Sequence, residues 1–276
     1  MATLVLFHAH PDDESIGTGG TIAKAVKDGH RVVLVTATRG EHGEYPEGFL
    51  APGETLAARR EQEMADAVAV LGIDRHVFLG YQDSGMMGTP ENDDPASFWQ
   101  ADVEEAAQRL ARILEEEHAD VLTVYDANGI YGHPDHIKVY EVGVRAAEIA
   151  GTPKVYETTV NRTRWRERAA RGQTPTRSVE TVDGVDRMIE EPASDEPRTI
   201  EFPLGVEEEE LTTAVDVRDF VDVKKRAMRA HASQITDESF FMQMSDEAFA
   251  EGFGTEWFIL RGAPKGIHEH DLFAGL

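Results

Sequence analysis

Short apolar runs that each end in polar residues constrain the fold of this 276-residue chain most strongly. Unbroken runs of about four to eight residues rich in Val, Leu and Ile are typical of strands buried on both faces of a parallel sheet. The chain has three such runs, at residues 4–8, 32–36 and 121–125, and a weaker one at 77–79. Two later candidate strands are residues 154–160 and 256–261.

Patterns that favour helices lie between and after these runs. The predicted helices span residues 21–27, 55–71, 103–117, 135–150, 162–171 and 219–232. Strands that alternate with helices form βαβ units with right-handed crossovers, and these build a parallel sheet. The sequence therefore predicts the α/β class, with a Rossmann-like, mostly parallel sheet flanked by helices and an elaborated C-terminal part.

No clean linker separates the motifs, and 41% hydrophobic residues suffice for a substantial core. We therefore expect one domain over residues 1–276. Residues 1–160 would form the Rossmann-like core that carries a metal site, and residues 161–276 would complete the substrate pocket. Residues 172–198 combine prolines with many acids, which is typical of a loop or a mobile excursion.

The composition excludes several classes of protein. The chain has no cysteine, so disulfides and thiolate nucleophiles are excluded, and His and carboxylates must hold any metal. A formal net charge of −25 argues against nucleic acid and anionic membranes as partners, because phosphate binding needs a basic face. The sequence lacks a signal peptide pattern and any apolar stretch of about 18 residues. We expect a soluble cytoplasmic protein, and a homo-oligomer is left open.

A group of ligand-capable residues follows the first predicted strand. It consists of His8, His10, Asp12, Asp13 and Glu14. Pro11 fixes its own φ and favours an extended His10, so this rigid turn can aim His10 and Asp13 at one point. Zinc accepts imidazole nitrogen and carboxylate oxygen. Because parallel sheets bind ligands beyond the carboxyl ends of their strands, the group favours a metal site with Asp12 free for another role.

A structural explanation of the same residues stays open. Asp12, Asp13 and Ser15 can cap the next helix, because carboxylates favour a helix N-terminus. His8 or His10 can be a core histidine whose hydrogen bonds are satisfied. The presence of the whole group at one strand end favours the metal site.

A second group follows the strand predicted at residues 121–125. It contains Tyr131, His133, Asp135 and His136. Asp135 can cap a helix whose first turn contains His136. A catalytic zinc keeps an open position and takes about three protein ligands, so His10, Asp13 and one of the two His in this group complete a set. The alternative is a pair of surface His, which the recurrence of His-Pro-Asp at two strand ends disfavours.

These residue types support amide hydrolysis by a metal-activated water. A zinc ion lowers the pKa of its bound water to about 7 and polarises a substrate carbonyl. Asp12 can take the water's proton and return it to the leaving amine, while His133 or Tyr131 stabilises the oxyanion. Without a cysteine or a Gly-x-Ser-x-Gly elbow, an acyl-enzyme route has little support.

The two groups resemble the motifs of the PIG-L/LmbE-type zinc deacetylase superfamily. Ala-His-Pro-Asp-Asp-Glu stands at residues 9–14 and His-Pro-Asp-His at residues 133–136, both intact and in the expected order. The resemblance implies that His10, Asp13 and His136 hold Zn²⁺, with Fe²⁺ or another divalent metal as an alternative. It also implies that Asp12 is the general base and then the acid.

The same resemblance assigns the residues around the ion. His133 would assist at the oxyanion, and Tyr131 is similar to a mobile tyrosine that contacts the carbonyl oxygen. Tyr131 can instead be a packing residue.

Further segments also resemble this superfamily, and two of them resemble its mycothiol-pathway branch. Residues 38–44 resemble a loop at the rim of the site, where Glu44 would contact substrate. Arg60 begins a segment that resembles an Arg-x-x-Glu element whose Arg binds a sugar hydroxyl. Asp83 lies in an Asp-Ser-Gly-Met segment that resembles the mycothiol-pathway branch, which implies a sugar contact. His231 lies in an Arg-Ala-His-Ala-Ser-Gln segment that also resembles this branch, which places it among the substrate-binding candidates.

Each of these outer residues also has a structural explanation. Arg60 can pair with Glu63 on its own helix, and Asp83 can initiate a turn before Gly85. His231 can be a core histidine of an amphipathic helix. The resemblance fades over about residues 162–210, which we regard as a candidate for substrate selectivity.

The leading hypothesis is a deacetylase whose substrate is a small-molecule amino sugar, N-acetylglucosaminyl-inositol. An amidase that cleaves mycothiol S-conjugates is the first alternative, and residues 271–275 slightly resemble that enzyme. A deacetylase of another N-acetyl glycoside in secondary metabolism is the second. A binding module without catalysis is disfavoured by the intact Asp12, and a dinucleotide site by the acids that precede residues 17–20.

Overall fold

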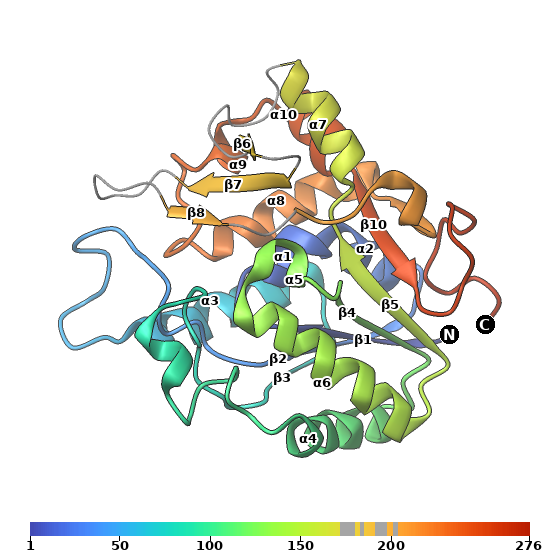
Figure 1. The fold of residues 1–276 in the computed structure, drawn as a ribbon, viewed down its shortest axis with the longest axis horizontal. Coiled ribbons are helices and arrows are strands. Elements are labelled where there is room, and N and C mark those ends of the chain that lie inside the picture. Colours follow the sequence, from blue (N-terminus) through green and yellow to red (C-terminus); the bar gives the residue numbers. More distant parts are fainter. Residues whose placement is uncertain (172–179, 183–184, 191–197, 201–203) are drawn as a thin grey trace.

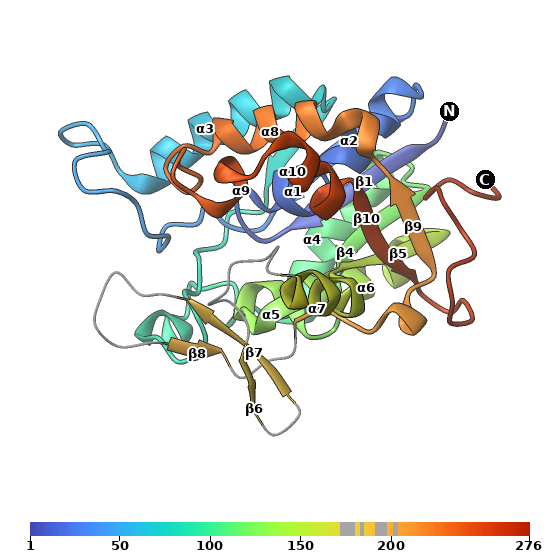
Figure 2. The same cartoon turned by 90° about the horizontal axis from the view of Figure 1, so that it is seen from above.

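The computed structural model describes residues 1–171, 180–182, 185–190, 198–200 and 204–276, and its centre is a seven-stranded sheet. The strand order is β3-β2-β1-β4-β5-β10-β9; Figure 1 labels the first six, and Figure 2 shows β9 beside β10. These strands are β1 (Thr3–His8), β2 (Arg31–Thr36), β3 (Arg75–Phe78), β4 (Val121–Tyr125), β5 (Lys154–Thr159), β9 (Thr213–Asp216) and β10 (Thr255–Leu260). The first five in that order run parallel, whereas β10 is antiparallel to both of its neighbours. The predicted α/β class is confirmed.

Both faces of the sheet are covered, which explains the unbroken apolar runs. Leu4, Val5, Leu6 and Phe7 of β1 are all fully buried. Because side chains alternate along a strand, Val5 and Phe7 enter one hydrophobic core, and Leu4 and Leu6 enter the other.

Helices supply the two covering layers (Figure 2). One layer contains α4 (Val103–Glu116) and α6 (Pro134–Ala150), and the other contains α2 (Gly19–Lys27), α3 (Leu56–Leu71) and α8 (Val221–Ala230). The shorter helices are α1 (Asp13–Gly17), α5 (Gly129–Gly132), α7 (Arg162–Ala170), α9 (Phe240–Gln243) and α10 (Asp246–Phe253). Short 3-10 helices are η1 (Pro90–Asp93), η2 (Glu208–Glu210) and η3 (Arg218–Phe220).

The order of the parallel strands reverses between β1 and β4. From β1 the chain moves to β2 and β3 on one side, and from β4 it moves to β5 on the other. The carboxyl ends of strands at such a switch point are where open α/β sheets bind ligands. Because β1 leads into residues 9–14 and β4 leads into residues 126–136, both predicted groups lie at this edge.

The predicted strands and helices are confirmed with small shifts in their ends. The elements that were not predicted include α1, α5, α9, α10 and β9. Helix α1 precedes α2 as a separate element, with Asp13 and Glu14 in its first turn, where carboxylates are favourable. Strand β9 pairs with β10, and its four residues are too few to show a clear periodic pattern.

The prediction of a loop over residues 172–198 is wrong for part of that range. Strand β6 (Glu180–Val182) pairs with β7 (Val185–Glu190), and β7 pairs with β8 (Arg198–Ile200), all antiparallel. Backbone groups form these ladders, so nearby prolines and acids do not forbid them. The rest of the range, residues 172–179, 183–184 and 191–197, lies outside the described residues.

The C-terminal part shares the central sheet with the N-terminal part, because β9 and β10 extend the sheet that β1 to β5 begin. This shared sheet supports one domain over residues 1–276, which stays a prediction. None of the helices among the described residues combines the length and apolar character that a membrane span needs.

Candidate active site

Two turns at the switch point carry the candidate residues. The first runs from β1 through Pro11 into α1, and its Asp12 has a φ of 107°. The second runs from β4 through Ile130, which has a φ of 65°, into α6. A positive φ is unfavourable for residues with a Cβ, and such residues cluster at functional sites. The backbone at Asp12 and Ile130 is therefore strained, and this conformation sets the directions of the side chains in both turns.

The carboxylate of Asp13 lies between His10 and His136. Its Oδ2 is 3.4 Å from His10 Nδ1, and its Oδ1 is 3.4 Å from His136 Nε2. Two ligand atoms that each lie about 2.1 Å from a tetrahedral ion are about 3.4 Å apart. Nitrogens of His10, His133 and His136 also lie within 4.8 Å of one another. This cluster can hold one metal ion.

The burial of His136 tests whether a metal fits. The residue is 2% exposed, and neither ring nitrogen has a hydrogen-bond partner among the described residues. Buried polar atoms are nearly always satisfied, so an ion in front of Nε2 would supply the missing partner. Tyr125 stacks on the imidazole at a centroid distance of 4.2 Å and fixes its plane. Two imidazoles and a carboxylate are a donor set that suits zinc and several other divalent metals.

Asp135 orients His10 from the side opposite Asp13. His10 Nε2 lies 3.1 Å from Asp135 Oδ2, so the ring donates to this carboxylate and its Nδ1 faces Asp13. The backbone N–H and the hydroxyl of Ser84 also donate to Asp135. The prediction that Asp135 caps α6 is wrong, because His133 is the N-cap and its Nδ1 accepts from the Asp135 amide.

Carboxylates outnumber cations around His10. Burial alone would lower the pKa of its imidazole, but Asp83, Asp13 and Asp135 hold the pKa well above its ordinary value. Asp83 Oδ1 lies 3.5 Å from His10 Nε2. This excess of negative charge favours a cation at the site.

Asp12 lies beside the cluster and has a different partner. Its Oδ2 is 3.3 Å from Nη2 of Arg60. Burial raises the pKa of Asp12 to about 6, and Arg60 opposes that rise. A carboxyl group with a pKa near neutrality can accept a proton and release it within one reaction cycle.

His133 and Tyr131 border the cluster on the side of α5. The His133 ring lies 4.6 Å from the His10 ring and 5.2 Å from the His136 ring, between centroids. Burial, and then the nearby His10 and His136, lower the pKa of His133 well below its ordinary value. The neutral ring accepts from the backbone through Nδ1, which leaves Nε2–H as a donor. The Tyr131 ring lies 5.0 Å from the His136 ring.

Arg60 and Asp83 are both buried near the first turn. Arg60 donates to the carbonyl oxygens of Pro11 and Gly40, in addition to its contact with Asp12. Glu63, the alternative partner on the same helix, instead accepts two hydrogen bonds from Ser233. Asp83 accepts from the amide of Gly85, as a turn residue does, but the same carboxylate also reaches His10.

Glu44 and His231 occupy opposite environments. Glu44 is exposed on the rim loop, and its carbonyl oxygen accepts from Gln234 at 3.0 Å. His231 is fully buried, and its Nε2 lies 2.8 Å from Oε1 of Glu14. Because His231 has no exposed surface, its side chain is linked to the site by its contact with Glu14.

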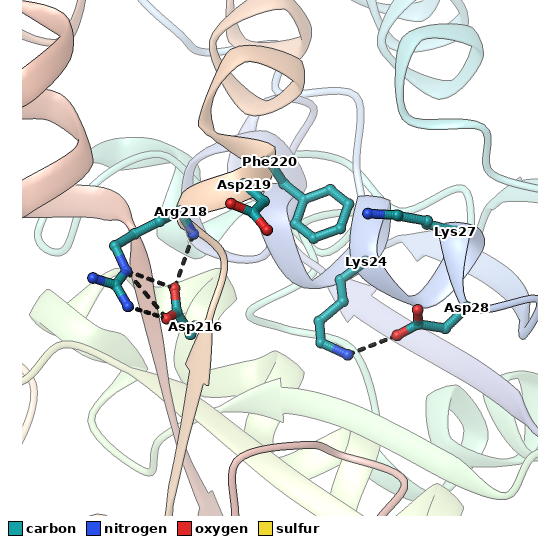
Figure 3. Close-up of a pocket in the computed structure, with 7 residues that line it drawn as sticks. All are labelled: Lys24, Lys27, Asp28, Asp216, Arg218, Asp219 and Phe220. Carbon is teal, nitrogen blue, oxygen red and sulfur yellow. Dashed lines mark hydrogen bonds and ion pairs between the residues drawn. The ribbon is translucent and has the colours of Figure 1, made fainter.

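A separate hollow of about 580 Å³ lies between α2 and the segment that joins β9 to α8 (Figure 3). Its charges are paired locally, Lys24 with Asp28 and Arg218 with Asp216. Its other lining residues are Lys27, Asp219 and Phe220. Three cations face three anions, so no net charge selects a ligand there, and the switch point remains the candidate site.

The family described as PIG-L, GlcNAc-PI de-N-acetylase, matches residues 5–147, which include both turns. A 1D-myo-inositol 2-acetamido-2-deoxy-alpha-D-glucopyranoside deacetylase from Acidothermus cellulolyticus is 43% identical, over 100% of this chain and 96% of the relative. A protein of the same name from Nocardiopsis dassonvillei is 42% identical, over 99% of this chain and 100% of the relative.

A solved structure of an N,N'-diacetylchitobiose deacetylase from Pyrococcus horikoshii is similar to this chain in fold. The TM-score is 0.59 at 22% identity, and the match covers 94% of this chain and 83% of that chain. Likeness at this level shows the fold alone. The family match over more than half of the chain and the end-to-end relatives above 40% identity carry the assignment. This chain belongs to the PIG-L family of de-N-acetylases.

Proposed function

We propose that this chain is a zinc-dependent hydrolase that removes the acetyl group from N-acetylglucosaminyl-inositol. The observation that carries the proposal is the position of Asp13, at 3.4 Å from both His10 and His136, with the separate carboxylate of Asp12 next to it. The substrate is proposed because two relatives above 40% identity carry the name of that deacetylase.

In this proposal His10, Asp13 and His136 hold the metal. Asp135 supports the proposal by accepting a hydrogen bond from His10, which fixes the ring and its proton. A bound zinc ion would lower the pKa of a water molecule and polarise the acetyl carbonyl group. Fe²⁺ and other divalent ions are alternatives with the same donor set.

In this proposal Asp12 transfers the proton of the attacking water, and His133 stabilises the negative charge on the carbonyl oxygen. Asp12 accepts a proton from the attacking water as the water oxygen bonds to the carbonyl carbon, and the carbonyl electron pair moves onto its oxygen. His133 donates from Nε2–H to that oxygen, and Tyr131 is a second donor. As the carbon–nitrogen bond breaks, Asp12 returns its proton to the amine, so an amide and water become acetate and an amino sugar.

We assign substrate recognition to residues around the first turn, which joins β1 to α1. Asp83 and Arg60 are buried, and Glu44 is exposed on the loop of residues 38–44. We propose that Glu44 and Asp83 contact sugar hydroxyl groups. Arg60 is proposed to contact the substrate from the position in which it holds Asp12. His231 is assigned a supporting part, which is developed below.

Metal analysis and one substitution test the proposal. Purified protein should contain about one zinc ion per chain. Asp12→Asn should retain the ion and lose turnover, whereas Asp66→Asn, the same change at an exposed position of α3, should keep wild-type rates. Protein that neither contains zinc nor responds to added metal ions would overturn the metal-dependent mechanism, and turnover by Asp12→Asn would remove Asp12 as the base.

A side-by-side assay separates the possible substrates. N-acetylglucosaminyl-inositol, free N-acetylglucosamine and a mycothiol S-conjugate would be compared by kcat/KM. The names of the relatives favour the first. The tail that slightly resembles the amidase packs near α2, where Phe273 stacks on His30 and Asp271 pairs with Lys24. Preference for the S-conjugate would replace the proposed substrate by the amidase substrate.

The cytoplasmic location and the homo-oligomer stay predictions. Gel filtration with light scattering would measure the second.

A further inference from the structure

We infer that Glu14 and His231 form a positioning pair that fixes the backbone of Asp12, so that the C-terminal part of the chain sets the geometry of the catalytic base. The inference rests on the proposed function, in which Asp12 moves the proton. It gives His231 a task that its complete burial permits, since a side chain with no exposed surface cannot touch a sugar in this structure.

Asp12 has a backbone conformation that needs support. Its φ of 107° and ψ of −31° lie outside the regions that a residue with a Cβ adopts readily. Among the described residues only His118 and Ile130 share a positive φ without being glycine. Such a conformation persists only where neighbouring groups hold it in place.

Hydrogen bonds to both backbone groups of Asp12 give that support. Its N–H donates to Oε2 of Glu14 at 3.0 Å. Its carbonyl oxygen accepts from the amides of Ser15 and Ile16, each at 3.0 Å. The backbone of Asp12 is therefore fastened to the first turn of α1, and its carboxylate stays free for Arg60 and for a proton.

Glu14 is in turn held by His231. The Glu14 side chain is fully buried, and its Oε1 accepts from the Ser15 hydroxyl and lies 2.8 Å from His231 Nε2. A buried carboxylate is stable only when it is paired and hydrogen-bonded. His231 Nδ1 has no hydrogen-bond partner among the described residues, so the ring makes its one side-chain hydrogen bond to Glu14.

The pair joins distant parts of the chain. His231 is the C-cap of α8, and its carbonyl oxygen accepts from the amides of Gln234 and Ile235 at 3.0 and 2.8 Å. The end of α8 therefore fixes the position of the His231 ring. The ring holds the Glu14 carboxylate, which accepts the hydrogen bond from the Asp12 amide. Both side chains are fully buried, so we assign both as positioning residues.

Three variants and one matched control test the pair. His231→Leu removes the hydrogen bond, and His231→Gln keeps a side-chain N–H donor of similar reach. Glu14→Gln perturbs the other partner without a loss of volume. Ser233→Ala is the control, because Ser233 makes an equally buried bond from the same segment to Glu63 of α3, which leaves Asp12 untouched.

The pair predicts a specific split of the kinetic constants. His231→Leu and Glu14→Gln should lower kcat by about 10- to 100-fold, the range typical of outer-shell residues that orient the ligands of a metal site. KM should change by less than about threefold, and metal content should stay at about one ion per chain, because the ligands and the pocket wall are unchanged. His231→Gln should recover most of kcat, and Ser233→Ala should match the wild type.

A crystal structure of His231→Leu supplies a readout that does not depend on activity. The inference expects a changed φ at Asp12 or a lost bond to Glu14, with His10, Asp13 and His136 in place. An unchanged Asp12 in that variant, or equal losses of kcat in His231→Leu and Ser233→Ala, would overturn the inference. Turnover by Asp12→Asn would instead refute the proposed function, so the two failures are distinguishable. If His231→Leu does not fold, Glu14→Gln gives the same comparison.

Discussion

The buried pair of Lys224 and Glu256 offers a stringent test of how the C-terminal part is fastened to α2. Lys224 Nζ lies 2.6 Å from Glu256 Oε1, and the side chains are 1% and 3% exposed. The Glu256 carboxylate also accepts from the amides of Gly20 and Thr21 at 2.9 and 2.8 Å, in the first turn of α2. Glu256 therefore has three donors, whereas Lys224 has one acceptor among the described residues.

This asymmetry predicts that substitutions of Glu256 and Lys224 lower the free energy of unfolding by different amounts. Glu256→Gln leaves a buried ammonium group without its carboxylate, which typically costs about 3–5 kcal/mol of unfolding free energy. Lys224→Met leaves a carboxylate that still has two amide donors and a favourable helix N-terminus, so we expect only the loss of one charged hydrogen bond, about 1.5–3 kcal/mol. The double variant has no buried charge, and its cost should fall short of the sum of the single costs by about 2 kcal/mol or more.

Urea denaturation followed by circular dichroism measures these costs, provided that the m-values of the variants agree. Glu104→Gln is the control, since its partner Arg145 is 43% exposed and such surface pairs contribute about 1 kcal/mol or less. A larger cost for Lys224→Met than for Glu256→Gln, or single costs that add within about 0.5 kcal/mol, would refute the asymmetric pairing.

Three further predictions concern pH, packing and metal. Burial lowers the pKa of His76 from 6.5 to about 4, so the unfolded chain binds more protons in that range. Between pH 7 and pH 5 the wild type should lose about 2 kcal/mol of unfolding free energy that His76→Asn does not lose, as measured by urea titration at each pH. A Cβ at Gly143 would lie 2.3 Å from Val124 Cγ1, so Gly143→Ala should cost about 1–3 kcal/mol in the same assay, and added Val124→Ala should recover part of it. Zinc at 100 times its Kd should stabilise chelator-treated protein by about 2.7 kcal/mol in thermal unfolding, and His136→Ala should abolish most of this gain.

The parallel core was predictable because its signals are local. Unbroken apolar runs of five or six residues are explained by burial on both faces, as β1 shows with four consecutive side chains at 0% exposure. The rule that ligands bind beyond strand ends then predicted that residues 9–14 and 133–136 meet, and in the structure Asp13 lies between His10 and His136.

Contacts between distant residues were not predictable in this way. Nothing in the local pattern shows that His231 faces Glu14 across 217 positions, or that Asp135 binds His10 instead of capping α6. Strands β6, β8 and β9 have only three or four residues, too few for a clear side-chain periodicity. The sequence showed which residue types were available for catalysis, and the tertiary structure determines which of them support the others.

Three buried contacts change the expected division of labour between the two parts of the chain. Residues 161–276 were expected to complete a substrate pocket, and they also contact helices that lie close to residues 9–14. His231 binds Glu14 of α1, Ser233 binds Glu63 of α3, and Lys224 with Glu256 holds the start of α2. These contacts end on α1, α2 and α3. Because a strained turn keeps its shape only when neighbouring groups hold it, we expect the conformation of Asp12, the proposed base, to depend on His231, which contacts Glu14 across 217 positions.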